Sequence, residues 1–193
     1  MSSLIGHISA GAAIYLGQPN RGSAQVRVLL PLFILLALLP DFDYFSFWIF
    51  KINAEPRFTH SLAFCLAAST LAWVCLPLAG LERRLTALLP LSLASCSHLA
   101  LDLLVGVHPL PVFWPLPVPE IQSLVGLLPS AGHLSPGNYY LWRNLAIECG
   151  VLFPVLAFFI AVTRKTLLTT RLPKAGILLL IWIAFLAYSI HIH

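Results

Sequence analysis

The sequence predicts an all-α membrane protein, a polytopic helical bundle with about five to six membrane helices and a proline-rich loop that caps its outer end. Of the 193 residues, 59% are apolar and 9% are charged, whereas soluble domains are about 45–50% apolar and about 25% charged. The mean hydropathy is +0.90, and long apolar runs recur along the chain. Because each span needs about 20 residues, little of the chain is left for an extramembrane part. We therefore expect one integral-membrane domain over residues 1–193.

Six apolar segments account for the predicted helices, and short polar or proline- and glycine-containing breaks separate them. They cover residues 4–17, 27–40, 61–79, 85–106, 144–163 and 175–193. The first two are short for a full span, so we expect them to be tilted, partly interfacial or packed inside the bundle.

Two connections between these segments have their own composition. Residues 42–52 are rich in Phe, Tyr and Trp, which predicts a short helix lying in the headgroup zone. The longest connection, 107–143, is rich in proline and contains Trp114 and several other aromatic residues. We interpret it as the ordered cap, with its aromatic side chains at the membrane interface.

Basic residues are divided unequally between the two ends of the predicted bundle. One set of connections holds eight of them, Arg21, Arg27, Arg83, Arg84, Arg164, Lys165, Arg171 and Lys174, and the other holds Lys51, Arg57 and Arg143. Cytoplasmic loops attract the Lys/Arg excess, so we expect the first set in the cytoplasm and both termini outside. The net charge of +4 then reflects membrane topology, and no nucleic-acid partner is indicated.

Ionisable residues in or beside the apolar segments converge on the predicted outer end. His98 and Asp102 are four residues apart and therefore share one helix face. An ionisable group inside a membrane costs free energy and indicates a function by default. The candidates come from five segments and are His7, Asp41, Asp43, His60, His98, Asp102 and Glu148.

This combination of side chains is typical of a site for two or more divalent ions. Imidazole favours zinc-like metals, and one carboxylate can bridge two ions. Two ions about 3.5–4 Å apart polarise a phosphoryl group and lower the pKa of a bound water to about 7. We therefore expect zinc-like cofactors and hydrolytic chemistry, with Asp41, Asp43 and Asp102 as candidate catalytic residues. His108, in the outer loop, is a further candidate ligand or proton shuttle.

Each residue alone also has a structural interpretation. His98 with Asp102 could be a hydrogen-bonded pair, and Asp41 with Asp43 could cap a helix. Arg57 and Arg143 flank the expected site, where either could hold a phosphate bidentately or contact lipid headgroups. Trp114 is a third candidate contact for the substrate.

Several strings resemble the LexA-regulated, membrane-bound metal-dependent hydrolase family over about residues 1–116. They are Gly6-His7, Leu39-Pro40-Asp41-Phe42-Asp43, Arg57-Phe58-Thr59-His60-Ser61, His98-Leu99-Ala100-Leu101-Asp102 and Phe113-Trp114-Pro115. That family is similar to zinc-dependent phospholipase C and the S1/P1 nucleases. The resemblance implies metal binding by His7, Asp43, His60, His98 and Asp102, and it places His108 where the phospholipases have another ligand. The H-x-x-x-E helix of the phospholipases corresponds here to residues 144–148, which retain Glu148 but lack the histidine.

Together these observations predict a bacterial inner-membrane hydrolase whose site faces the periplasm. Its expected reaction is cleavage of a phosphoester in a lipid or lipid-linked substrate by a metal-activated water, with Asp41 accepting the proton. Two alternatives remain, a metal-dependent hydrolase of amide or carboxylic-ester lipids and a divalent-metal transporter. Transporters usually bind their substrate near the membrane midplane on broken helices, whereas the cytoplasmic halves here are almost entirely Leu, Ala, Val and Ile.

Overall fold

The computed structural model describes residues 3–19, 23–51, 55–82, 87–123, 126–129, 137–165 and 172–191. Regular structure in these ranges is helical apart from one isolated β-bridge, so the all-α class is confirmed. The α-helices are α1 (Leu4–Leu16), α2 (Ser23–Leu38), α3 (Asp43–Phe50), α4 (Leu62–Cys75), α5 (Leu88–Val105), α6 (Tyr139–Thr163) and α7 (Leu172–His191). Short 3-10 turns cover Leu39–Phe42, Phe58–His60 and Leu76–Ala79.

Four helical stretches in the described residues are long and apolar enough to cross a membrane. They are Gln25–Phe42, Leu62–Ala79, Leu88–Val105 and Tyr139–Thr163. Two further apolar helices, α1 and the part of α7 from Leu178 to His191, are shorter. The expected five to six membrane helices thus correspond to four full-length candidates and two shorter helices.

Two boundaries differ from the sequence expectation. The second helix begins at Ser23 and continues through the 3-10 turn to Phe42, so it is long enough for a full span. The helix expected from residue 144 begins at Tyr139, because Asn138 caps it by accepting a hydrogen bond from the Tyr140 amide at 3.0 Å. Arg143 therefore lies in the first turns of α6 rather than in the preceding loop.

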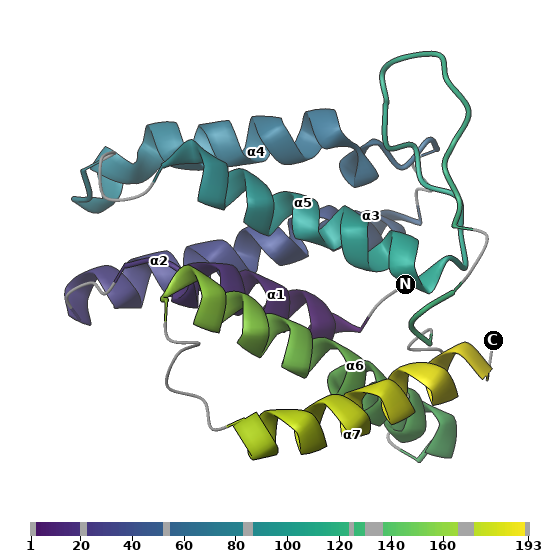
Figure 1. Ribbon diagram of the computed structural model, residues 1–193. Coiled ribbons are helices and arrows are strands. Elements are labelled where there is room, and N and C mark those ends of the chain that lie inside the picture. The colour runs from purple at the N-terminus through teal and green to yellow at the C-terminus, as the bar shows by residue number, and fades with distance from the viewer. Residues whose placement is uncertain are drawn as a thin grey trace.

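The helices are arranged with α4 and α5 on one side, α1 and α2 in the middle, and α6 and α7 on the other side (Figure 1). One end of the bundle, which we call the loop end, carries the N-terminus, α3, the loop after α5 and the end of α7. The C-terminal ends of α1, α4 and α6 and the N-terminal ends of α2, α5 and α7 lie at the opposite end. The chain thus has the two ends that the sequence predicts, but Arg21, Arg83, Arg84 and Arg171 lie outside the described residues. Which end faces the cytoplasm stays a prediction.

The central helices approach one another closely through small residues. A Cβ atom on Gly11 of α1 would lie 2.7 Å from the Phe33 carbonyl oxygen of α2, so this crossing requires glycine. Beyond that crossing, at the end opposite the loop end, a buried apolar cluster joins α1, α2 and α5. Its members include Ile14, Tyr15, Leu29, Phe33 and Leu91.

The loop after α5 begins as a hairpin. Gly106 ends α5 with a φ of 68°, in the left-handed region that glycine adopts readily. Leu110 and Ile121 then exchange two backbone hydrogen bonds of 2.8 and 2.9 Å. In Figure 1 this hairpin projects sideways past the end of α4 instead of lying across the bundle interior. The expected cap is therefore, in this part, a projecting hairpin, while residues 124–125 and 130–136 lie outside the described residues.

Candidate metal centre

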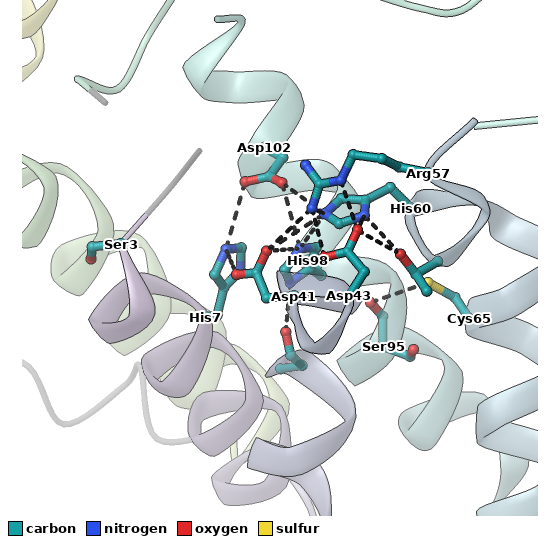
Figure 2. Close-up of polar contacts among 12 residues, drawn as sticks. Ser3, His7, Asp41, Asp43, Arg57, His60, Cys65, Ser95, His98 and Asp102 are labelled. Carbon is teal, nitrogen blue, oxygen red and sulfur yellow. Dashed lines mark hydrogen bonds and ion pairs between the residues drawn. The ribbon is translucent and has the colours of Figure 1, made fainter. Parts of the chain in front are cut away.

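Four separate segments meet inside the loop end and bring their ionisable side chains together (Figure 2). α1 supplies His7, the 3-10 turn after α2 supplies Asp41, the 3-10 turn before α4 supplies His60, and α5 supplies His98 and Asp102. The three imidazoles are fully buried, and Asp102 is 5% exposed. The convergence expected from the sequence is therefore present for these residues.

Local sequence explains why these side chains point inward. Pro40 stands near the start of the 3-10 turn that follows α2, and this turn presents Asp41 to the interior before α3 begins at Asp43. Ser61 caps α4 by accepting a hydrogen bond from the Phe64 amide at 3.2 Å, which fixes the turn that holds His60. His98 and Asp102 lie one turn apart on α5, with 3.4 Å between Nε2 and Oδ2.

One group of four donor atoms has the dimensions of a tetrahedral metal site. It comprises Asp41 Oδ1, His60 Nε2, His98 Nε2 and Asp102 Oδ2, and these residues can place their ligand atoms within 4.8 Å of one another. Five of the six separations are 3.3, 3.4, 3.6, 3.6 and 3.6 Å. Zinc held tetrahedrally at about 2.0–2.1 Å would separate its ligands by about 3.3–3.4 Å. The group therefore fits such an ion with little adjustment.

Hydrogen bonds at the far side of each imidazole determine which nitrogen faces the group. His98 Nδ1 lies 2.8 Å from the Ala37 carbonyl oxygen, which can only accept, so Nδ1 carries the proton. Thr59 Oγ1 donates to Asp43 Oδ2 at 3.2 Å and so accepts from His60 Nδ1 at 3.1 Å. When both imidazoles are neutral, the two Nε2 atoms face each other as acceptors at 3.3 Å, an arrangement that a cation between them would stabilise.

A second group forms around His7 and uses the opposite oxygens of the same two carboxylates. The His7 ring stacks on the His98 ring, with centroids 3.9 Å apart. His7 Nε2 lies 3.6 Å from Asp102 Oδ1 and 3.9 Å from Asp41 Oδ2. Asp41 and Asp102 thus each direct one oxygen toward His60 and His98 and the other toward His7. Both His7 nitrogens and Asp41 Oδ1 are buried without a hydrogen bond to any described residue.

Arg57 is the cation nearest to both groups in the described part of the chain. Its Nε and Nη2 atoms bind Asp43 bidentately, at 2.7 and 2.9 Å, and Nη2 also lies 3.1 Å from His60 Nε2. Burial lowers the pKa of His60, and the Arg57 charge lowers it further against the pull of the Asp41 carboxylate. With neutral imidazoles, three carboxylates against one guanidinium leave two negative charges, which bound divalent ions would compensate.

This geometry can be set beside known proteins. The family model described as YdjM inner membrane protein matches residues 1–192. The chain belongs to this family. No curated protein and no solved structure matches the chain. As a YdjM-family member, it is an inner membrane protein with four candidate membrane helices and a buried His/Asp cluster that could bind a metal.

Two predicted metal ligands of this YdjM-family protein, Asp43 and Glu148, form hydrogen bonds to neighbouring segments. Asp43 accepts hydrogen bonds from Arg57 and Thr59, and its Oδ2 atom lies 3.7 Å from His60 Nδ1. It therefore contacts the side of the His60 ring opposite to Nε2. Glu148 of α6 accepts hydrogen bonds from the Ser3 amide at 3.0 and 3.3 Å, while Ser3 caps α1. Glu148 therefore anchors the start of α1 one turn before His7.

The other predicted site residues lie farther from the two groups. His108 is exposed in the loop after α5. Arg143 donates to Asn144 Oδ1 and stacks over Tyr140. The Trp114 ring packs against the ring of Phe58, with centroids 5.6 Å apart. Phe58 precedes His60 by two residues along the chain. Their proposed roles as ligand or substrate contacts stay predictions.

Sequence reasoning gave no role to Thr59 or to the Ala37 carbonyl, although these two groups fix the imidazole tautomers. The signal for Thr59 was its position directly before His60. The Ala37 carbonyl has no sequence signal, because every residue carries one.

Proposed function

We propose that this YdjM-family protein is a membrane-embedded hydrolase that uses two divalent metal ions. Zinc is the metal that best fits the donor atoms and their separations. The observation that supports this most directly is the division of the Asp41 and Asp102 oxygens between the His60–His98 pair and His7. One carboxylate that bridges two ions holds them at the short separation that phosphoryl-transfer chemistry uses.

The two groups differ in the number of protein donors. The His60–His98 group has four, which completes a tetrahedral shell, whereas His7, Asp41 Oδ2 and Asp102 Oδ1 supply three. Catalytic zinc sites usually have three protein ligands and keep one position for water or substrate. Ions bound here would supply a water of lowered pKa and would stabilise negative charge on the reacting oxygens.

The exposed edge of the cluster identifies where a substrate could approach. Asp41 is 15% exposed, compared with 3% for the Asp102 side chain, and Arg57 is 28% exposed. The Asp41 side of the cluster is therefore where water or substrate would enter, and Arg57 places a positive charge next to the incoming group, with Nη2 4.0 Å from Asp41 Oδ1. Asp43 holds the Arg57 guanidinium in this orientation.

A lipid or lipid-linked phosphoester is the substrate class that suits this position. The edge lies beside the turn after α2 and beside α3, where Phe42, Ile49 and Phe50 are exposed. Such apolar surface next to a charged opening favours an amphipathic substrate that arrives from the leaflet. From the basic-residue asymmetry we expect this end to face the periplasm. Hydrolysis of an amide or carboxylic-ester lipid would use the same ions to polarise a carbonyl group.

The interior beneath the cluster argues against a transport path. In the described residues, the buried histidine, aspartate and glutamate side chains are His7, His60, His98, Asp102 and Glu148, and all lie toward the loop end. Below them α1, α2 and α5 close around buried apolar residues such as Leu29, Phe33 and Leu91. An ion pathway would need polar groups that continue toward the other membrane face.

The experiment that tests hydrolysis uses the purified full chain in detergent, incubated with phosphodiester, phosphomonoester and acyl-ester lipids. We expect headgroup or phosphate release that a chelator abolishes and zinc restores. His98→Ala should be inactive, whereas Thr70→Ala, which changes an exposed side chain of α4 that donates to the Leu66 carbonyl oxygen, should remain active. If metal-replete protein cleaved none of these lipids and proteoliposomes accumulated zinc, the proposed hydrolase function would be wrong and a transporter function would be supported.

A further inference from the structure

The hairpin after α5 exposes apolar side chains where an aqueous loop would expose polar ones. Phe113, Trp114, Leu116, Val118 and Ile121 are between 37% and 61% exposed. From Leu110 to Ile121 the only charged residue is Glu120. A contiguous exposed apolar surface of this kind marks a contact with a membrane or another protein.

The backbone of the same hairpin has few N–H groups that lack a hydrogen-bond acceptor within the hairpin. Four of its twelve residues are prolines and have no N–H group: Pro111, Pro115, Pro117 and Pro119. Of the eight remaining N–H groups, six donate to carbonyl oxygens inside the hairpin over 2.8–3.0 Å, namely those of Leu110, Val112, Trp114, Leu116, Val118 and Ile121. An N–H group without a partner costs several kcal/mol in a lipid environment. Folding the hairpin removes most of that cost before any lipid contact is made.

The position of the hairpin makes the membrane itself the natural partner. The Leu62 amide at the start of α4 donates to the Val112 carbonyl oxygen at 2.9 Å, which attaches the hairpin to a candidate membrane span. The apolar side chains of α4 that are exposed include Leu66, Leu71 and Val74. In Figure 1 the hairpin extends sideways beyond the end of this helix, roughly across the helix axes. It therefore lies parallel to the plane of a membrane that the bundle crosses.

We propose that the 110–121 hairpin inserts into the lipid leaflet at the loop end and is a lipid-contact surface of the protein. Trp and Tyr side chains favour the boundary between headgroups and acyl chains, and the Trp114 ring of the hairpin packs against Phe58. Since Phe58 stands between Arg57 and His60, the inserted hairpin sets the headgroup level beside the exposed edge of the metal cluster. The insertion does not depend on any hydrolytic activity.

Trp114 provides a direct test in the full-length protein. Wild type and Trp114→Phe are reconstituted into phosphatidylcholine–phosphatidylglycerol vesicles, and the difference between their emission spectra isolates Trp114. We expect this difference signal to be lost in vesicles whose acyl chains are brominated near the headgroup and to be little reduced by aqueous iodide. Trp182→Phe is the matched control, because Trp182 lies in α7 and donates to the Val151 carbonyl oxygen at 2.9 Å.

The opposite pattern, with quenching by iodide and none by brominated lipid, would show that the hairpin stands in water and would overturn the proposal. A second measurement covers the case in which Trp114→Phe fails to fold. A nitroxide at Leu116→Cys, in a chain with its four native cysteines replaced, should collide more often with oxygen than with a water-soluble nickel chelate. At Gln122→Cys, just beyond the hairpin, the order should reverse. A preference for the nickel chelate at both positions would also contradict insertion, whatever the hydrolase assay shows.

Discussion

The two ends of the unit formed by α1, α2 and α5 have opposite interiors. At the loop end these helices and their adjoining turn enclose His7, Asp41, His98 and Asp102. Toward the other end the same helices enclose an apolar cluster that includes Phe33. One end concentrates charge that costs free energy to bury, and the other supplies apolar packing.

This difference indicates how the chain can keep a charged cluster inside a small bundle. The Gly11 crossing and the apolar cluster below it hold α1, α2 and α5 in fixed register, so their polar residues meet without further adjustment. A site that is rigidly supported in this way loses little free energy when it binds its ligand. Substitutions at the two ends should therefore affect different properties.

The largest expected effect belongs to His98→Ala at the loop end. This change removes a donor from the four-atom group and also the ring on which His7 stacks. We expect bound metal to fall sharply and lipid hydrolysis to reach background, with the helical content unchanged. Elemental analysis and circular dichroism measure the two properties. Full metal content in the folded variant would show that His98 is not a ligand.

Phe33→Ala at the apolar end should change stability instead. Phe33 is fully buried, and truncation of a buried aromatic ring costs about 3–5 kcal/mol. We expect a lower thermal midpoint, with the same amount of metal per folded chain as in wild type. Thermal unfolding in detergent, with metal analysis of the folded fraction, would separate the two ends. Equal loss of metal in Phe33→Ala and His98→Ala would mean that the ends are not independent.

A smaller effect is expected for Thr59→Val, which keeps the shape of the side chain but removes its hydroxyl group. His60 Nδ1 then loses its acceptor, and Asp43 loses a donor. Loss of an outer hydrogen bond to a ligating histidine typically weakens metal binding about 10–100-fold. Competition with a chelator of known affinity measures this change, and Thr59→Ser should restore most of it. An unchanged metal affinity in Thr59→Val would show that the hydrogen bond from His60 Nδ1 to Thr59 does not contribute to metal binding.

The smallest effect should follow from His108→Ala. His108 is exposed and lies beyond Gly106, outside the two donor groups. We expect unchanged metal content and at most a small change in turnover, measured on the same preparations as His98→Ala. A loss comparable to that of His98→Ala would extend the metal cluster into the loop after α5.

The sequence predicted the helical class and the gathering of the rare ionisable residues, because charges inside apolar segments are few and their positions within the helices can be read directly. It could not show how Asp41 and Asp102 divide their oxygens, since this depends on side-chain rotation. The bidentate bond between Arg57 and Asp43 had no signal either, because the 3-10 turns that bring these two residues together have no regular period. The start of α6 was set too late because Tyr139, Tyr140 and Trp142 suggested an interfacial loop, although aromatic residues also occupy helix ends at that level.

The most direct measurement of the two-ion centre is the metal content of wild type and His7→Ala, purified in parallel and loaded with zinc. His7 contributes only to the three-donor group, so its loss should remove one ion and leave the His60–His98 group filled. We expect two ions per chain in wild type and one in His7→Ala. A single ion in wild type that persists in His7→Ala, or no bound metal in either protein, would contradict a carboxylate-bridged pair.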